Sequence, residues 1–169
     1  MSSESARASS AAEARFRIDD ANSIQRTVKV VALDAPSEAV VARLAAAEWG
    51  GAGFLTAAVF AAAPGGDMAV ARIGERGDRS GQTNPLTAGD GADLVALVAT
   101  AGEEIAAACV VGEACRVVGA TTIAFVLTGP STAHAALSRT LARLRPWTLM
   151  LTIAEDEDCI ADVLRALRA

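Results

Sequence analysis

The sequence predicts an α/β protein with three layers, in which a Rossmann-like, mostly parallel sheet carries helices on both faces. Two nearly continuous apolar runs, residues 94–99 and 121–127, flank a segment whose apolar positions recur at helical spacing between Ile105 and Val118. Strand, helix and strand in this order form the βαβ unit, and strands without polar alternation are typical of parallel sheets buried on both faces. A composition of 52% hydrophobic but only 4% aromatic residues fits layers of small side chains.

The first strand and the first helix of the domain follow from residue type. The β-branched apolar run at 28–33 predicts a strand. Pro36 beside Ser37 is typical of a helix start, and residues 39–49 are expected to form the helix, which Gly50 ends.

The remaining elements are read in the same way. We expect further strands at 54–63, 68–73 and 147–153, further helices at 131–144 and 155–168, and a polar loop at 74–90. The strand at 68–73 is short and is expected at or near an edge of the sheet. In the central βαβ unit, Glu103 and Glu104 are expected to open the helix and Gly119 to end it. The loop before that helix then lies at the carboxyl edge of the sheet, where such folds bind ligands.

Length and charge limit the classes of function. Residues 1–25 are rich in Ser, Ala and charge, which predicts a flexible tail, and 26–169 are expected to form one domain. The net charge of −5 gives no electrostatic support for a nucleic-acid partner. No apolar run is long enough for a membrane span and no secretory leader is recognisable, so we expect a cytoplasmic protein.

Cysteine and histidine often bind metals or act in catalysis, but in this sequence their positions favour structural roles. The three cysteines, Cys109, Cys115 and Cys159, form neither a metal pair nor a disulfide framework, because Cys109 and Cys115 should point to different faces of one helix. We expect all three to be buried free thiols. His134 is the only histidine and is expected to be a surface or capping side chain rather than a catalytic base.

Several short stretches resemble the N-terminal, GTPase-type domain of the FtsZ/tubulin family. Residues 29–33 are similar to its first strand, 49–59 to its second, and the Ile73-Gly74-Glu75 stretch with residues 79–85 to its next glycine-rich loop. The resemblance covers roughly residues 26–164 and implies the FtsZ fold, with a GTP site along the carboxyl edge of the sheet.

The loops that would hold the nucleotide depart from the family pattern. The family's first phosphate loop is a run of glycines, whose place is taken here by Asp34, Pro36, Ser37 and Glu38. The family's signature glycine loop is shortened, so that two glutamates follow Gly102 directly. Two like charges about 4 Å apart repel by ~4 kcal/mol at an effective dielectric near 20, so carboxylates here oppose a triphosphate.

The resemblance therefore predicts a degenerate nucleotide cleft with no cofactor, to which neither GTP nor GDP binds tightly. Its positions are Asp34, Ser37, Glu38, Arg79, Gly81, Asn84, Ala101, Gly102, Glu103 and Glu104. In the family, hydrolysis also needs a loop from the following domain of the next subunit, and we expect that domain to be missing from this chain.

The favoured hypothesis is a non-catalytic FtsZ-like pseudo-GTPase that acts through protein–protein contacts, as an assembly, scaffold or regulatory component. Two alternatives stay open, a nucleotide-binding FtsZ/tubulin-type protein and a small Rossmann-like enzyme or ligand-binding protein. We expect a monomer or small closed oligomer whose acidic face, made by Asp34, Glu38, Glu103 and Glu104, binds a basic or amphipathic protein partner. A divalent cation is the other ligand that these carboxylates could take, although no metal-loop spacing is present.

Overall fold

A computed structural model describes residues 26–57, 71–72, 91–167 and 169. The expected tail, residues 1–25, and the loop at 74–90 with Arg79, Gly81 and Asn84 lie outside these described residues. The strand expected at 54–63 is described as far as residue 57, and the one at 68–73 only at residues 71–72.

The predicted α/β class is confirmed. Within the described residues, six strands form one sheet in the order β3-β2-β1-β4-β5-β6. The five parallel strands are β1 (Val28–Ala32), β2 (Ala52–Thr56), β4 (Leu94–Thr100), β5 (Thr121–Leu127) and β6 (Met150–Ala154). The short β3 (Ala71–Arg72) runs antiparallel to β2 at one edge, where the sequence had placed it.

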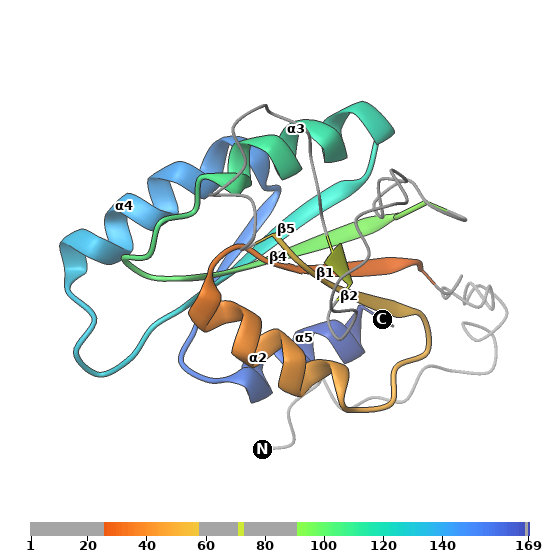
Figure 1. The fold of residues 1–169 in the computed structure, drawn as a ribbon, viewed down its shortest axis with the longest axis horizontal. Coiled ribbons are helices and arrows are strands. Elements are labelled where there is room, and N and C mark those ends of the chain that lie inside the picture. Colours follow the sequence, from red (N-terminus) through yellow and green to blue (C-terminus); the bar gives the residue numbers. More distant parts are fainter. Residues whose placement is uncertain (1–25, 58–70, 73–90, 168) are drawn as a thin grey trace, which may run out of the picture.

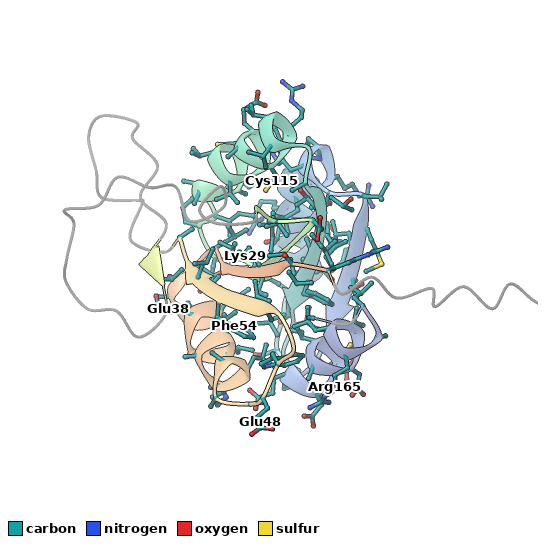
Figure 2. The ribbon with its side chains drawn as sticks, turned by 90° about the vertical axis from the view of Figure 1, so that its right-hand side faces the viewer. Lys29, Glu38, Glu48, Phe54, Cys115 and Arg165 are labelled. Atoms are coloured by element: carbon teal, nitrogen blue, oxygen red, sulfur yellow. The ribbon has the colours of Figure 1, made fainter. Side chains whose placement is uncertain are left out.

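Helices cover both faces of the sheet, as Figure 1 shows. One face carries α2 (Ala35–Ala45) and α5 (Glu157–Ala166), and the other carries α3 (Ala107–Val118) and α4 (His134–Leu144). A short 3-10 helix, η3 (Arg145–Trp147), follows α4. Phe54 and Cys115 lie on opposite sides of the sheet (Figure 2).

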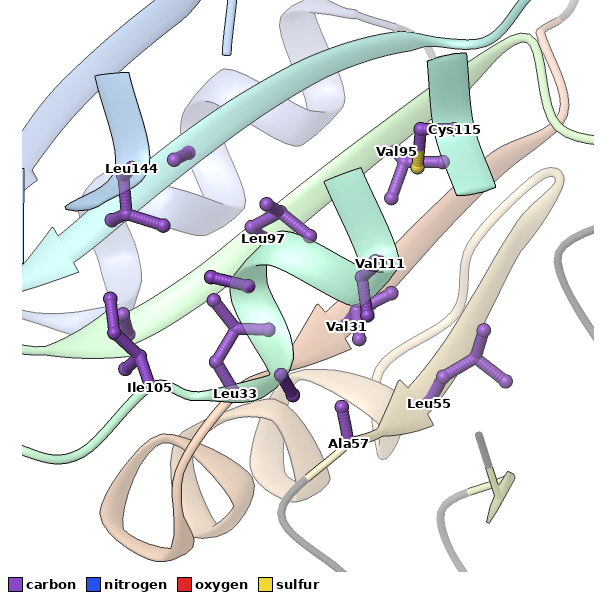
Figure 3. Close-up of a cluster of buried hydrophobic side chains, with 14 of the residues drawn as sticks. Val31, Leu33, Leu55, Ala57, Val95, Leu97, Ile105, Val111, Cys115 and Leu144 are labelled. Atoms are coloured by element: carbon purple, nitrogen blue, oxygen red, sulfur yellow. The ribbon is translucent and has the colours of Figure 1, made fainter. Parts of the chain in front are cut away.

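The sheet separates two hydrophobic cores, because successive residues of each strand point to opposite faces. The α3/α4-side core, most of which is drawn in Figure 3, consists of Val31, Leu33, Leu55, Ala57, Val95, Leu97, Ala99, Ile105, Ala107, Ala108, Val111, Cys115, Ala124, Val126 and Leu144. The α2/α5-side core consists of Val28, Val30, Ala32, Val41, Leu44, Leu94, Ala96, Val98, Ile123, Phe125, Ala154, Ile160, Ala161, Leu164 and Ala169. The central strand β4 contributes alternate residues to both cores, which explains its unbroken apolar run.

The start of α2 lies four residues before the predicted one. The sequence predicted a helix at 39–49, whereas α2 spans Ala35–Ala45. The reason is the capping residue, since the side chain of Asp34 rather than Ser37 accepts the first free backbone N–H, and Pro36 lies in the first turn. The expected start of α3 at Glu103 and Glu104 is also wrong, because this helix begins at Ala107; its expected end is confirmed, with Gly119 at φ 74° as the C-cap.

Candidate functional site

The candidate site lies at the carboxyl ends of β1 and β4, which are neighbours in the sheet. After β1 the chain leads to α2 on one face, and after β4 it leads to α3 on the other (Figure 1). The two connections therefore diverge at this point, which is where open parallel sheets bind their ligands. Asp34 and Thr100 are the polar residues that these two strands bring together here.

Asp34 is the centre of this region and is only 5% exposed. Its Oδ1 accepts a hydrogen bond from the backbone N–H of Ser37 (2.8 Å), and its Oδ2 accepts one from the backbone N–H of Thr100 (2.7 Å). The Ser37 hydroxyl completes a capping box by accepting from the Asp34 N–H at 3.2 Å. The carboxylate thus joins the first turn of α2 to the end of β4.

This arrangement has an electrostatic consequence for α2. The free N–H groups and the dipole of a helix N-terminus attract an anion, and in many α/β proteins that anion is a ligand phosphate. Here the carboxylate of Asp34 is the anion, and both of its oxygens are engaged. The start of α2 is therefore already occupied by the chain's own charge.

Glu38 is also held within the fold. It lies in the first turn of α2, is half-buried, and its Oε2 accepts a hydrogen bond from the Thr56 hydroxyl at the end of β2 (3.0 Å). The expected exposed face of four carboxylates is consequently wrong for Asp34, which is buried. Glu103 and Glu104 remain exposed.

The loop after β4 turns away before α3 begins. Gly102 has φ 96°, and its N–H donates to the hydroxyl of Thr140 on α4 at 3.0 Å. Glu104 forms an ion pair with Arg143 of α4, with 2.6 Å between Oε1 and Nη1. The first turn of α3 therefore contains no acidic residue, and Glu103 and Glu104 do not oppose an anion at that helix in the way the sequence suggested.

Among the described residues of this region, the Thr100 side chain is buried without a hydrogen-bond partner. The Thr100 backbone N–H binds Asp34, but Oγ1 is buried and forms no hydrogen bond; it is the one such side-chain atom among the described residues. A buried hydroxyl without a partner costs about 1–3 kcal/mol, unless something that is not part of the chain satisfies it. Ala101, which follows, is half-buried and donates its N–H to the Leu127 carbonyl.

The other candidate side chains do not join this region. His134 is exposed at the start of α4, which confirms a surface side chain. Cys109 and Cys115 point to different faces of α3 as predicted. The prediction of three buried thiols is right for Cys115 but wrong for Cys109, which is exposed, and for Cys159, which is only half-buried. Across the described ranges, no group of three or more His, Cys, Asp or Glu side chains is placed to hold a metal ion.

The sequence pattern predicts the correct edge of the sheet for Asp34 and Ser37 but does not reveal the role of Thr100. The contact between Asp34 and Thr100 joins positions 66 residues apart, and no local pattern encodes such a pair. The signal that was available is the Asp-x-x-Ser spacing from Asp34 to Ser37, which is typical of a helix cap.

Comparisons with known proteins add no relative: no protein-family model matches the chain, and no curated protein matches it. No helix in the described part of the chain is both long and apolar enough to span a membrane. The class of protein is therefore defined by the fold, a three-layer α/β domain with a Rossmann-like sheet.

Proposed function

We propose that this chain is a non-catalytic, FtsZ-like pseudo-GTPase domain that acts through protein–protein contacts. The FtsZ likeness rests on the succession of sequence matches along residues 26–164. The proposed absence of catalysis is supported by the Asp34 carboxylate. It occupies the N-terminus of α2 at the switch point of the sheet.

Phosphate binding at the N-terminus of α2 would require displacement of this carboxylate. A phosphate group that bound the first turn of α2 would have to replace Asp34 as the acceptor of the Ser37 N–H. Hydrogen bonds to a charged group contribute about 1.5–3 kcal/mol each, and the displaced carboxylate would repel the incoming phosphate. The binding free energy of a nucleotide would be reduced by both terms.

Thermal unfolding with GTP, GDP and Mg²⁺ tests the proposal. A ligand at 100 times its Kd adds about 2.7 kcal/mol to the free energy of unfolding, so even modest binding raises the Tm. We expect no rise in Tm and no absorbance at 260 nm from nucleotide retained during purification. A rise with GTP and Mg²⁺ that exceeds the rise with Mg²⁺ alone would contradict the proposal and favour a nucleotide-binding FtsZ/tubulin-type protein.

A pair of variants makes the role of Asp34 specific. Asp34→Asn removes the charge at the switch point, while Asp156→Asn changes the N-cap of α5, where the Asp156 side chain accepts from the Cys159 N–H. If the buried charge of Asp34 is what excludes phosphate, inorganic phosphate should raise the Tm of Asp34→Asn more than that of Asp156→Asn. Equal responses would show that Asp34 does not control anion binding at this edge.

The partnerless Thr100 hydroxyl favours the alternative of a small ligand-binding protein. Native mass spectrometry of the purified protein tests it, with Thr100→Val as the matched variant, since valine has the same shape without the hydroxyl. A small molecule that is retained by the natural protein and lost in Thr100→Val would support ligand binding. If neither protein retains a molecule and Thr100→Val is as stable as the natural protein or more so, the hydroxyl is only an unsatisfied group.

A further inference from the structure

The edge strand β6 combines exposure with an apolar surface. Within the described residues, it lies at the end of the sheet opposite β3, at the right of Figure 2 in blue. The segment 149–154 has no charged residue. Leu149 is 84%, Met150 39% and Ile153 49% exposed, so large apolar side chains face solvent along this edge.

Proteins normally protect such an edge. Edge strands that stay unpaired usually carry Lys, Pro, a bulge or an inward-pointing charge, because their free N–H and C=O groups can pair with another strand. The strand β6 has none of these features over its five residues, MLTIA. At the opposite edge, the described residues form the two-residue strand β3.

The pairing of β6 with β5 shows which side chains share a face. Leu151 is the partner of Ala124 and Ile153 the partner of Val126, and both partners belong to the α3/α4-side core. Leu151 itself packs against that core. Leu149 precedes β6 at a bend of the backbone, and its N–H donates to the Thr122 carbonyl of β5 at 2.8 Å. Leu149 and Ile153 are the two exposed neighbours on either side of Leu151.

We propose that β6 pairs with β6 of a second copy of this chain, antiparallel and about a two-fold axis at Leu151. A two-fold axis perpendicular to the sheet keeps the α3/α4 face on one side, so opposing residues must share a face. With the axis at Leu151, Leu149 of each copy lies opposite Ile153 of the other, and the two Leu151 residues face each other. Directly opposed residues lie about 4.5–5.5 Å apart, so the exposed side chains of both copies would bury one another.

The charges that flank β6 fit this direction of pairing. Arg145 is exposed at the start of η3, five positions before β6, and Glu155 is exposed directly after the strand, followed by the acidic start of α5. In an antiparallel pair, the basic end of one strand meets the acidic end of the other, at both ends of the interface. A parallel pair would instead bring like charges together, which is unfavourable.

This proposal goes beyond the proposed function because it names a partner, a second copy, and it does not depend on the absence of catalysis. If the chain is a dimer that binds nucleotide, the pseudo-GTPase proposal is overturned and the dimer proposal stands. If the chain is a monomer that binds no nucleotide, the dimer proposal is overturned and the pseudo-GTPase proposal stands. The two proposals therefore fail on different measurements.

Sedimentation equilibrium over a concentration series measures the association. We expect the natural chain to form a dimer, and Leu149→Lys and Ile153→Lys to raise the dimer Kd by about tenfold or more, since each places a charge in an apolar cross-strand pair. The matched control is Val117→Lys on α3, a residue of similar size and 77% exposed, which should leave Kd unchanged. Because Leu149 and Val117 are largely exposed and Ile153 is about half exposed, circular dichroism and Tm should show an intact fold.

Two further variants test the register and the direction. Leu151→Cys should form an intermolecular disulfide on mild oxidation, whereas Leu149→Cys should not, because residue 149 lies opposite residue 153 rather than its own copy. Arg145→Glu and Glu155→Arg should each weaken the dimer, and the double variant should recover it. A monomeric natural chain, a dimer that is insensitive to Leu149→Lys and Ile153→Lys, or a disulfide at residue 149 but not 151 would overturn the proposal. A complex with a different protein through β6 in place of self-association would overturn it as well.

Discussion

Gly112 of α3 lies against the indole of Trp147, so closely that a Cβ on its backbone would be 2.7 Å from the Trp147 ring atoms. Real Cβ atoms do not approach other heavy atoms so closely, and only glycine lets α3 and η3 meet in this way. The contact joins the layer of α3 to the segment that leads into β6.

We therefore expect Gly112→Ala to be destabilising, although alanine is the better helix former. The propensity gain is about 1 kcal/mol, while overpacking at a close contact costs about 1–3 kcal/mol, so the net loss should be about 1 kcal/mol. Urea unfolding measures it. In a Trp147→Gly background the Cβ, Cγ and Cδ2 atoms that a Cβ at residue 112 would meet are all gone, and Gly112→Ala should be neutral or stabilising. The same loss in both backgrounds would show that the indole is not the cause.

The Asp34 carboxylate predicts an unequal effect of two N-cap substitutions. Asp34→Ala removes the cap of α2, worth about 0.5–2 kcal/mol, and also leaves the Thr100 N–H without its acceptor, which adds about 1–3 kcal/mol. Asp156→Ala removes only the exposed cap of α5 and should cost about 1 kcal/mol. Chemical denaturation of both variants checks this prediction. Equal losses would mean that the contact between Asp34 and Thr100 contributes little.

How far the sequence predicts the fold can be seen at the two ends of α3. Its end was predictable because Gly119 adopts φ 74°, a conformation that glycine favours, so a local signal determines where the helix stops. Its start was not, because the loop is set by Thr140 and Arg143 of α4, which follow Glu104 by 36 or more positions. The local periodicity of apolar residues does not predict contacts between residues so far apart in the sequence.

The same distinction holds at the candidate site. The edge of the sheet that carries Asp34 and Ser37 follows from the βαβ pattern, and so it could be predicted. The burial of Asp34 could not, since it depends on the Thr100 N–H of a strand 66 residues away. The position of β6 at an edge could not be predicted either, because it depends on the order of all strands in the sheet. The absence of charged residues from β6 is visible in the sequence.

The buried thiol of Cys115 should differ in reactivity from the other two cysteines. Burial raises the pKa of the Cys115 thiol above its ordinary value, an effect that the hydrogen bond with the Thr122 side chain partly offsets. Thiolate is the reactive form, so Cys109, which is exposed, should react with a thiol reagent first and Cys115 only on unfolding. Peptide mapping after timed alkylation checks the order, and early labelling of Cys115 would contradict it.

The raised thiol pKa also has a consequence for alkaline stability. Because the folded state holds the Cys115 proton more tightly than the unfolded state, this thiol's contribution to stability is fully present below the unfolded thiol pKa, ~8.5. It is lost as the pH rises from there through the folded pKa. The free energy of unfolding should thus fall over this alkaline range, and fall less steeply in Cys115→Ala. Parallel slopes for both proteins would mean that Cys115 does not contribute.

The exposed glutamates after β4 should tolerate charge reversal. Glu104 pairs with Arg143, but the two side chains are 67% and 53% exposed, and exposed ion pairs contribute about 0–1 kcal/mol. Glu104→Lys should therefore cost at most about 1 kcal/mol and cost less at high salt, where the repulsion between Lys and Arg143 is screened. Glu103 has no ion pair among the described residues, so Glu103→Lys should cost less than Glu104→Lys.

Urea unfolding at low and high ionic strength measures these two changes and their combination. If the double variant folds as expected, it can be used to test whether the exposed acidic surface binds a basic or amphipathic protein. A loss of binding in this variant would then come from the reversed charges and not from unfolding. A loss of several kcal/mol, independent of salt, would instead mean that these glutamates support the loop that positions Thr100 beside Asp34.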